Sequence, residues 1–352
     1  MKFLRNAWYA AGWSEEIGRE LFQRKMLNEA VLLYRTEDGR AIAMSDYCPH
    51  RFAPLHLGKL IGDTVECPYH GLQFDCSGQC VDNPHGDGVI PKAAQVRTYP
   101  VEERYGLVWV WMGDPANADA TKIADYSCLT DTSKFKAVHG YIKLNANYQL
   151  VMDNLTDLSH ASFVHETTLE PRETAKHKFH VSEENGVIFT RQWCANNPIT
   201  PLFKAVLGMD GPVDHWLEMR FVPPANTMTY YGITRPGATR EEGWDTHNPN
   251  IITPETETTT HYFWGTARTF DLENEQLTEM FRAGASHAFE NEDRPMLESQ
   301  QALIGSTDLM TLKPVLLVND AGSVRVRRML QRMIDEEDTQ PKVIPVTPVS
   351  AT

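Results

Sequence analysis

Two short segments, each with a cysteine and a histidine, constrain this chain most. They read Cys48-Pro-His50 and Cys67-Pro-Tyr-His70, and sixteen residues separate His50 from Cys67. Two thiolates and two imidazoles brought together can hold either one zinc ion or one [2Fe–2S] cluster. A zinc finger separates its ligands into a Cys pair and a His pair, and that separation is absent around these four residues. The pattern therefore favours an iron–sulfur cluster.

Composition limits the class of protein. The 352 residues are too many for one ordinary domain and suit two. A hydrophobic content of 41% supports sizeable cores, and the formal net charge of −14 argues against a nucleic-acid or anionic-membrane partner. No apolar run reaches the roughly 18 residues of a membrane span, and the N-terminus lacks a signal-peptide core. The cysteines suggest no disulfide framework, so we expect a cytoplasmic protein.

The N-terminal third predicts an all-β domain over residues 1–115. Short apolar runs at 30–34, 41–44 and 107–111 are separated by turn sequences such as Glu37-Asp-Gly39. Short strands with Gly and Pro turns are typical of a small antiparallel sandwich or barrel.

Residues 116–335 predict a second domain of the α+β class, and residues 336–352 predict a mobile tail. A helical pattern covers 147–164, and strand-like patterns follow between 177 and 268. One long amphipathic helix is expected from Asn274 to Ile304, interrupted by Pro295.

The helical stretch carries a candidate second metal site. Asp153, Asp157 and His160 follow at i, i+4 and i+7, on one helical face. His160 and His165 stand about 140° apart on an ideal helix, so both can reach one metal only with a π-bulge or a break, which we expect after Ser162. Two imidazoles and one carboxylate form the ligand set of non-haem Fe(II) oxygenases. The segment 290–293, Glu-Asn-Glu-Asp, is the expected carboxylate donor.

With these two candidate sites, the chain resembles the oxygenase component of the Rieske non-haem iron oxygenases, in the branch of aromatic O-demethylases and methyl hydroxylases. The resemblance covers nearly the whole chain and rests on several motifs. These are Arg5–Tyr9, Cys48–Pro54, Cys67–Leu72, Asp153–Asp157, Ile252–Thr256 and Asp320–Gly322.

The resemblance implies a fold, two cofactors and roles for particular residues. It implies a Rieske domain followed by a helix-grip domain, in which a curved antiparallel sheet surrounds a long helix, and a homotrimer. The cluster ligands would be Cys48, His50, Cys67 and His70, and the mononuclear iron ligands would be His160, His165 and Asp293. Asp157 would link a mononuclear-iron histidine to the Rieske histidine of the next subunit, and Asn154 would lie near the iron.

The implied reaction is O₂-dependent hydroxylation of the methyl carbon of an anionic methoxyaromatic, which releases formaldehyde. The chain has no Gly-x-Gly-x-x-Gly stretch to bind NAD or flavin, so electrons are expected from NAD(P)H through a separate reductase or a ferredoxin. Two alternatives stay open: a C-methyl hydroxylase of a carboxylated or sulfonated toluene, and a Rieske electron-transfer or ligand-binding protein without oxygenase activity.

Residues that bind the substrate are expected from the same resemblance. Positions that hold a substrate carboxylate in this branch correspond to Trp111, Thr229 and Asn250. Arg220 and His247 are further candidates for a cationic anchor, although each is also typical of a strand surface.

Overall fold

The computed structural model describes residues 2–176, 178–305 and 308–339. The chain forms two compact units. Among the described residues, the N-terminal unit comprises 2–122 together with 332–339, and the C-terminal unit comprises Ile123–Gln331. In the described ranges no helix is long and apolar enough to cross a membrane.

The N-terminal unit extends a few residues further than the predicted boundary after residue 115. Two short 3-10 turns, Pro115–Asn117 and Ala120–Lys122, still belong to it. Their main chain is bonded to the strands, because Nε1 of Trp8 donates to the carbonyl of Asp119 at 2.9 Å and Arg104 donates to the carbonyl of Ala120 at 3.0 Å.

The predicted tail is also shorter than expected. Helix α6 spans Ala321–Thr339, so residues 336–339 are helical. The carboxylate of Glu337 in this helix accepts the main-chain N–H of Arg5 at 2.8 Å, which ties the helix end to the start of the chain. Residues 340–352 of the predicted tail lie outside the described residues.

Three small antiparallel sheets build the N-terminal unit, with strand orders β1-β11-β10, β2-β3-β4-β9 and β5-β6-β7-β8. This all-β architecture is the predicted one. The strands are β1 Trp8–Trp13, β2 Phe22–Met26, β3 Glu29–Arg35, β4 Ala41–Ser45, β5 Lys59–Ile61, β6 Thr64–Glu66, β7 Gln73–Phe74, β8 Cys80–Asp82, β9 Thr98–Tyr99, β10 Val101–Arg104 and β11 Leu107–Trp111.

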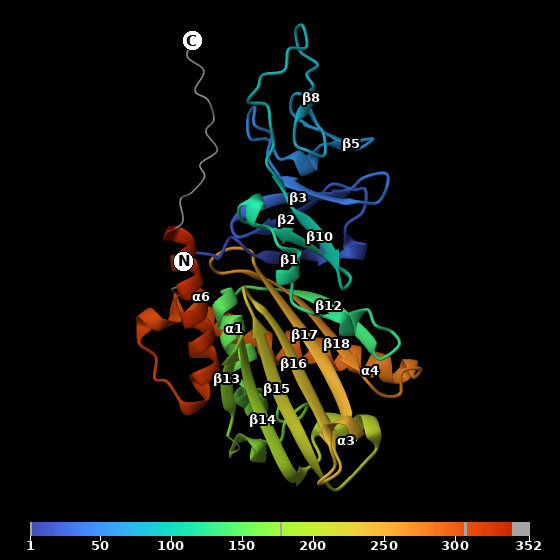
Figure 1. Ribbon diagram of the computed structural model, residues 1–352, viewed down its shortest axis with the longest axis vertical. Helices are drawn as coiled ribbons and strands as arrows, with labels where there is room; N and C mark the ends of the chain where they lie inside the picture. The colour runs from blue at the N-terminus through green and yellow to red at the C-terminus, as the bar shows by residue number, and fades with distance from the viewer. Residues whose placement is uncertain (1, 177, 306–307, 340–352) are drawn as a thin grey trace. The chain divides into compact units, whose positions relative to one another are not determined.

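One antiparallel sheet of seven strands, in the order β12-β18-β17-β16-β15-β14-β13, dominates the C-terminal unit (Figure 1). Its strands are long, and sequential strands are neighbours from β13 to β18. The strands are β12 Lys136–Leu144, β13 His180–Glu184, β14 Val187–Pro198, β15 Pro212–Val222, β16 Asn226–Thr234, β17 Trp244–Pro254 and β18 Thr260–Arg268.

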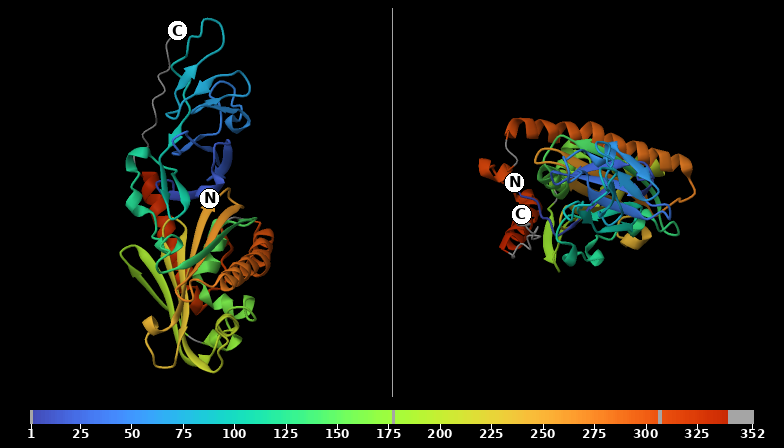
Figure 2. Two further views of the ribbon diagram at one scale, coloured as in Figure 1. Left: turned by 90° about the vertical axis from the view of Figure 1, so that its right-hand side faces the viewer. Right: turned by 90° about the horizontal axis from the view of Figure 1, so that it is seen from above.

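Helices flank this sheet (Figure 2). The α-helices are α1 Tyr148–Thr156, α2 Ala161–Val164, α3 Pro201–Leu207, α4 Glu275–His287, α5 Arg294–Ile304 and α6 Ala321–Thr339. Asn147 and Asn274 begin α1 and α4, because their side chains accept the N–H groups of Gln149 and Leu277. The α+β class and the strand-then-helix order agree with the prediction.

The long helix expected from Asn274 to Ile304 is present, but its centre is not α-helical. A π-helical turn, Ala288–Asp293, joins α4 to α5, and the N–H of Arg294 bonds to the carbonyl of Phe289, five residues earlier. Pro295 lies in the first turn of α5, where its missing N–H costs little. The proline therefore follows the irregular turn and does not end the helix.

The π-turn packs on one face of the sheet. The ring of Phe289 lies 5.1 Å from that of Tyr262 and 5.7 Å from that of Trp264, both on β18. Gly140 of β12 pairs with Trp264 and leaves room for its indole, since a Cβ there would lie 2.3 Å from a ring carbon. We call the face that carries Tyr262 and Trp264 the helix-facing side.

Candidate metal centres

Two loops of similar construction carry the paired cysteines and histidines of the N-terminal unit. The N–H of Cys48 donates to the carbonyl of Ala53, and that of Cys67 donates to the carbonyl of Leu72. Each loop also turns four residues after its cysteine, at Phe52 and at Gly71, which have φ values of 56° and 72°. A left-handed conformation is easy for glycine and uncommon for phenylalanine, so the shared geometry is specifically maintained.

The loops place two thiols inside and two imidazoles outside. Cys48 and Cys67 are 1% and 2% exposed, whereas the rings of His50 and His70 lie toward the surface, 4.5 Å apart. Burial, followed by the nearby His50, lowers the pKa of His70 and keeps it in the neutral form that a metal ligand needs. This donor set, two thiols facing two imidazoles, fits a cluster in which cysteines hold one iron and histidines the other.

The chemistry of Cys48 supports the same assignment. Burial raises the pKa of its thiol to about 11, and the neighbouring Cys67 adds to the effect. The Cys48 thiol is therefore a poor acid in the bare protein, but a bound iron would hold it as a thiolate.

In the C-terminal unit the helix that carries the candidate iron ligands is broken, but not where the sequence predicted. Helix α1 ends at Thr156, Asp157 takes an extended conformation, and a 3-10 turn covers Leu158–His160. Helix α2 then runs through Ser162 without a break and ends at Val164. The predicted break after Ser162 is therefore wrong, and the second irregularity is the π-turn that carries Asp293.

These two irregularities bring His160, His165 and Asp293 together. Their ligand atoms all lie within 4.8 Å of one another. Oδ1 of Asp293 is 3.6 Å from Nε2 of His160 and 3.3 Å from Nε2 of His165. Bonds of about 2.1 Å to one metal place neighbouring ligand atoms about 3 to 4 Å apart, so the three residues fit one ion. Three protein ligands leave the other positions of an octahedral iron open.

Hydrogen bonds fix the orientation of both imidazoles. Nδ1 of His160 donates to the main-chain carbonyl of Asp157, and Nδ1 of His165 lies 2.7 Å from Oε2 of Glu292. Because carbonyls and carboxylates only accept, each Nδ1 carries the hydrogen and each Nε2 offers its lone pair to the metal. Glu292 was expected only as a possible ligand. A histidine that binds a metal through one ring nitrogen needs a hydrogen-bond partner for the other, and this requirement could have identified Glu292 as that partner.

Asp293 is buried and ionised. Burial acts to raise its pKa, but hydrogen bonding and charge from His165, the charge of His160 and the amide of Asn154 outweigh burial, and the pKa is lowered. Nδ2 of Asn154 donates to Oδ1 of Asp293 at 3.1 Å. Asn154 thus lies beside the candidate iron ligands, as the sequence predicted, and supports the carboxylate.

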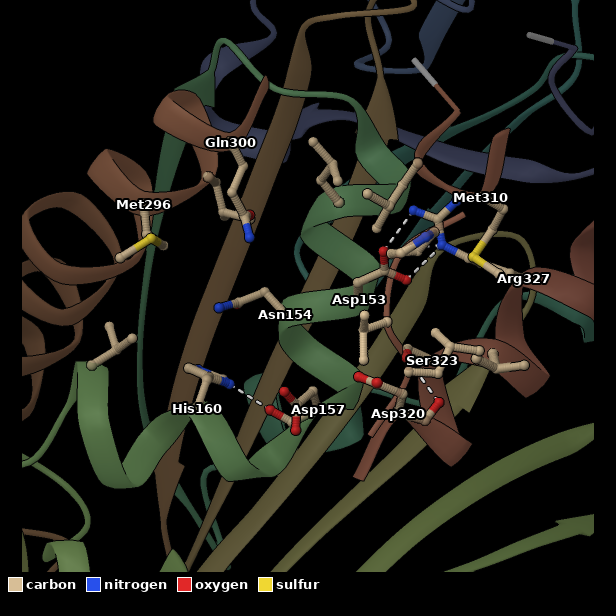
Figure 3. A pocket seen from close by; sticks show the side chains of 18 residues that line it. Asp153, Asn154, Asp157, His160, Met296, Gln300, Met310, Asp320, Ser323 and Arg327 are labelled. Atoms are coloured by element: carbon tan, nitrogen blue, oxygen red, sulfur yellow. Dashed lines mark hydrogen bonds and ion pairs between the residues drawn. The ribbon is translucent and has the colours of Figure 1, made fainter. Parts of the chain in front are cut away.

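The side chain of Asp157 does not bond to His160, contrary to our expectation. Its Oδ1 accepts the N–H of Ser159 at 3.0 Å and the hydroxyl of Ser159 at 2.5 Å, which caps the 3-10 turn. An extended Asp157 turns its carbonyl, and not its carboxylate, toward the imidazole. The half-buried carboxylate lines a pocket of about 220 Å³ with Asn154 and His160 (Figure 3).

Asp153, on the same helix, is bonded to another helix. Its carboxylate accepts hydrogen bonds from Nε and Nη2 of Arg327 in α6, at 2.8 and 2.6 Å (Figure 3). A further N–H of Arg327 donates to Gln149 at 2.8 Å. This bidentate pair joins α6 to α1 and accounts for Asp153 structurally.

Two of the three expected substrate residues meet on the helix-facing side. Nδ2 of Asn250 donates to Oγ1 of Thr229 at 3.3 Å, and Oδ1 of Asn250 accepts the hydroxyl of Tyr262 at 2.7 Å. Asn250 is 1% exposed, and its amide is occupied by these contacts and by the carbonyl of Asn248. It therefore orients its neighbours, whereas the half-buried Thr229 retains some accessible surface.

Trp111 makes its observed contacts within the N-terminal unit. It is fully buried in β11, packs edge-on against Trp8 and donates its Nε1 to the carbonyl of Asp114 at 2.8 Å. Its expected contact with the substrate stays a prediction. Trp264 is a tryptophan of the helix-facing side, and within the described chain its buried Nε1 has no hydrogen-bond partner.

Arg220 and His247 are not anion anchors on this side. Arg220 follows Met219 along β15 and therefore points to the opposite face, where it donates to the carbonyl of Asp125 at 2.8 Å. His247 follows Thr246 along β17 in the same way and lies 3.5 Å from Asp245.

Family models match both halves of the chain. Residues 7–100 match the Rieske [2Fe-2S] domain, and residues 144–336 match the vanillate O-demethylase oxygenase C-terminal domain.

Curated relatives match nearly end to end. The chain is 40% identical to the oxygenase component of chloroacetanilide N-alkylformylase of Rhizorhabdus wittichii, over 98% of this chain and 99% of the relative. It is 40% identical to the iron-sulfur subunit TsaM1 of the toluene-4-sulfonate monooxygenase system of Comamonas testosteroni, over 96% and 98%. It is 35% identical to the oxygenase component of dicamba O-demethylase of Stenotrophomonas maltophilia, over 95% and 98%.

Solved structures support the same family. Dicamba monooxygenase bound to 3,6-dichlorosalicylic acid superimposes with a TM-score of 0.92 at 35% identity, over 97% of this chain and all of the other. The same enzyme with non-haem iron and dicamba has a TM-score of 0.85 at 34% identity, over the same shares. The chain therefore belongs to the Rieske non-haem iron oxygenases, in the family of vanillate O-demethylase oxygenase components, whose cofactors are a [2Fe–2S] cluster and a mononuclear iron.

Proposed function

We propose that the chain is the terminal oxygenase of a monooxygenase system that hydroxylates the methyl carbon of an anionic methoxyaromatic. The observation that carries this proposal is the convergence of His160, His165 and Asp293 within 4.8 Å, next to the helix-facing side of the sheet. An electron carrier or a binding protein would not need these three ligands.

The two metal centres divide the chemistry. When bound, the mononuclear iron supplies O₂-dependent hydroxylation of a C–H bond, and the cluster, held by Cys48, His50, Cys67 and His70, supplies electrons. A hydroxylated O-methyl group is a hemiacetal, which breaks down to formaldehyde and a phenol.

The protein's own residues prepare the iron site. Glu292 and the carbonyl of Asp157 fix the tautomers of His165 and His160, and Asn154 holds Asp293. The half-buried Thr229, with the indole N–H of Trp264, offers polar contacts to a bound substrate on the helix-facing side. An indole N–H only donates, so it suits an anionic oxygen.

Asp157 serves the passage of electrons in this proposal. Its carboxylate reaches the pocket of Figure 3, and only its Oδ1 is engaged in the described residues, by Ser159. The other oxygen can accept a hydrogen bond from the His70 imidazole of a neighbouring subunit. We propose a homotrimer that makes this contact, located in the cytoplasm with its reductase or ferredoxin.

A C-methyl hydroxylase is the second candidate, because one relative of 40% identity acts in the toluene-4-sulfonate monooxygenase system. The same iron ligands serve both reactions. The products differ, since a hydroxylated C-methyl group is a stable alcohol.

One experiment separates the candidates. The purified protein, with a reductase, NADH and O₂, is offered a panel of methoxybenzoates and methylated benzoates or benzenesulfonates. Formaldehyde from a methoxybenzoate supports the main proposal, and a benzylic alcohol without formaldehyde supports the second. O₂ consumption with neither product would contradict both.

A further inference from the structure

A group of buried polar side chains on the helix-facing side is not used by the metal centres. The group, which we call the Glu170 cluster, comprises Glu170, Gln192, Thr200, His215 and Tyr231. All are more than nine-tenths buried, with exposures of 2%, 5%, 0%, 0% and 5%. Polar groups so deeply buried need partners, because an unpaired one is costly.

The sheet register places three members side by side. Tyr231 of β16 pairs with Leu217 of β15, and His215 lies two residues before Leu217 on the same face. His215 in turn pairs with Cys194 of β14, and Gln192 lies two residues before Cys194. Side chains two residues apart on a strand share a face. The three cluster members, with Leu217 and Cys194 between them, therefore line one continuous patch.

The other two members reach this patch from connecting segments, and Thr200, which precedes α3, lies near the hydroxyl of Tyr231. The N–H of Glu170 donates to the carbonyl of His165 at 3.2 Å, so one turn of chain separates the cluster from a candidate iron ligand. The hydroxyl of Tyr231 donates to the carbonyl of Leu169 at 2.8 Å. Oε2 of Glu170 lies 3.4 Å from Nε2 of His215.

The carboxylate also influences its neighbours. Burial raises the pKa of Tyr231 well above its ordinary value, and the charge of Glu170 adds to this. Burial raises the pKa of Cys194 to about 12, again with a contribution from Glu170. Glu170 therefore points among the side chains of the sheet.

Most polar atoms of the cluster make no well-aligned hydrogen bond in the described parts of the chain, although Glu170 lies near His215 and the hydroxyl of Tyr231 lies near Thr200 and Glu170. They are both carboxylate oxygens of Glu170, both ring nitrogens of His215, Nε2 of Gln192 and Oγ1 of Thr200. The buried Arg268 does not serve Glu170, because it donates to the carbonyls of Phe270, Asp271 and Asn274 and to Thr278. A buried carboxyl group whose nearest described partner is an imidazole nitrogen at 3.4 Å can still accept a hydrogen bond from a ligand.

We propose that the Glu170 cluster binds a hydrogen-bond donor, an N–H or an O–H, on the aromatic ring of the substrate. This rests on the proposed function, which supplies the aromatic substrate. Glu170 accepts the hydrogen, and the amide N–H of Gln192 donates to a lone pair of the same substrate group. His215 positions Glu170.

The cluster and the N–H of Trp264 occupy different parts of the helix-facing side. Trp264, Asn250 and Thr227 form one row across β18, β17 and β16, and Tyr231 lies four residues further along β16. A substrate group that the cluster binds therefore points away from this row.

The test uses three probes that differ at one atom: 3-methoxybenzoate with a hydroxyl, an amino group or a fluorine at ring position 4. The dissociation constant of each is measured by calorimetry on the holoenzyme without O₂, and formaldehyde is measured separately with reductase and O₂. We expect the hydroxyl or the amino compound to bind about tenfold or more tighter than the fluoro compound, which offers no donor. The hydroxyl and amino arms separate O–H from N–H recognition.

Variants assign the preference to Glu170. Glu170→Leu should reduce the preference to about threefold or less, because an apolar side chain of similar size cannot accept. Glu170→Gln is the second variant should the first not fold, and it should retain an intermediate preference through its amide oxygen. Glu173→Gln is the matched control, since Glu173 is exposed on the next turn, Arg172–Lys176.

The outcomes separate the two proposals. Equal binding of all three probes to the wild-type protein would overturn the inference, as would an unchanged preference in Glu170→Leu or, if that variant does not fold, in Glu170→Gln. Either would leave Glu170 and His215 as a structural pair that holds the loop. Failure of every probe to bind would also count against the inference. Tight, donor-dependent binding without formaldehyde would contradict the O-demethylase function alone.

Discussion

Nδ1 of His165 lies 2.7 Å from Oε2 of Glu292, the residue directly before the proposed iron ligand Asp293. Adjacent residues thus perform different tasks, since Asp293 lies among the candidate iron ligands and Glu292 holds one of the imidazoles of that group. The hydroxyl of Thr168 also donates to Glu292, at 3.0 Å, which fixes its carboxylate.

Asp293→Ala should remove the mononuclear iron and spare the cluster. Two imidazoles without a carboxylate hold Fe(II) weakly, so iron should fall from about three to about two atoms per chain. Metal analysis with acid-labile sulfide as the internal reference measures this. Glu290→Ala is the control, because Glu290 bonds only to Ser286 among the described residues. An unchanged iron content in Asp293→Ala would move the ligand role to Glu292 or Glu290.

Glu292→Gln should weaken iron binding without abolishing it. The amide can still face His165, but it favours its imidazole less than a carboxylate does, and changes of this kind cost about 10- to 100-fold in metal affinity. Titration of the iron-free protein with Fe(II) gives the affinity. An affinity equal to that of the wild type would show that the 2.7 Å contact is not needed for the site.

Asp157→Asn should stop turnover while both metal centres stay loaded. The main-chain carbonyl that orients His160 is unchanged, and an asparagine Oδ1 can still cap Ser159. Only the negative charge is lost, which the proposed contact with the neighbouring His70 needs. Single-turnover reduction kinetics measure electron transfer. Ser159→Ala removes the hydroxyl bond to Oδ1 of Asp157 but keeps the charge, so it should retain most activity.

The reduced protein should show the rhombic EPR signal of a histidine-ligated [2Fe–2S] cluster. Two neutral imidazoles in place of thiolates raise the reduction potential and lower the average g relative to an all-cysteine cluster. The buried Cys48 and Cys67 and the outward His50 and His70 give the expected ligand set. Zinc without labile sulfide would contradict it.

Removing the carboxylate from a methoxybenzoate substrate should raise KM about tenfold or more, because a buried donor would be left unpaired. Trp264→Phe tests the donor, since it keeps the ring that packs on Phe289 but removes the free N–H. In that variant, KM for the acid should approach KM for the neutral analogue. Equal KM values for both substrates in the wild type would show that the site does not recognise an anion.

The residues with strict spacing were predictable from the sequence. The cluster segments and the pair His160 and His165 stand in local motifs, and local motifs imply local geometry. The same reasoning limited the candidates for the carboxylate ligand to the segment 290–293. The general order of strands followed by one long helix was also confirmed, because period-two and period-3.6 patterns are long in this chain.

The errors have a common cause, which is that sequence spacing does not give the direction of a side chain. The carboxylate of Asp157 was expected to face His160, but the extended conformation of that one residue presents its carbonyl. Trp264 and Glu170 were missed because burial without a partner is visible only once the fold brings strands together.

The π-helical turn Ala288–Asp293 contains one residue more per turn than an α-helix would. Deleting a single residue there, such as Asn291, would let α4 and α5 fuse into a regular α-helix. The two helices would keep their faces toward the sheet, because a π-turn holds about one extra residue without turning the helix that follows it. Only the wide turn that carries Asp293 would be lost, and the chain there would shorten by about 1.5 Å. A chain-length change of one residue, with no substitution of a ligand, would thus show whether iron binding depends on this turn alone.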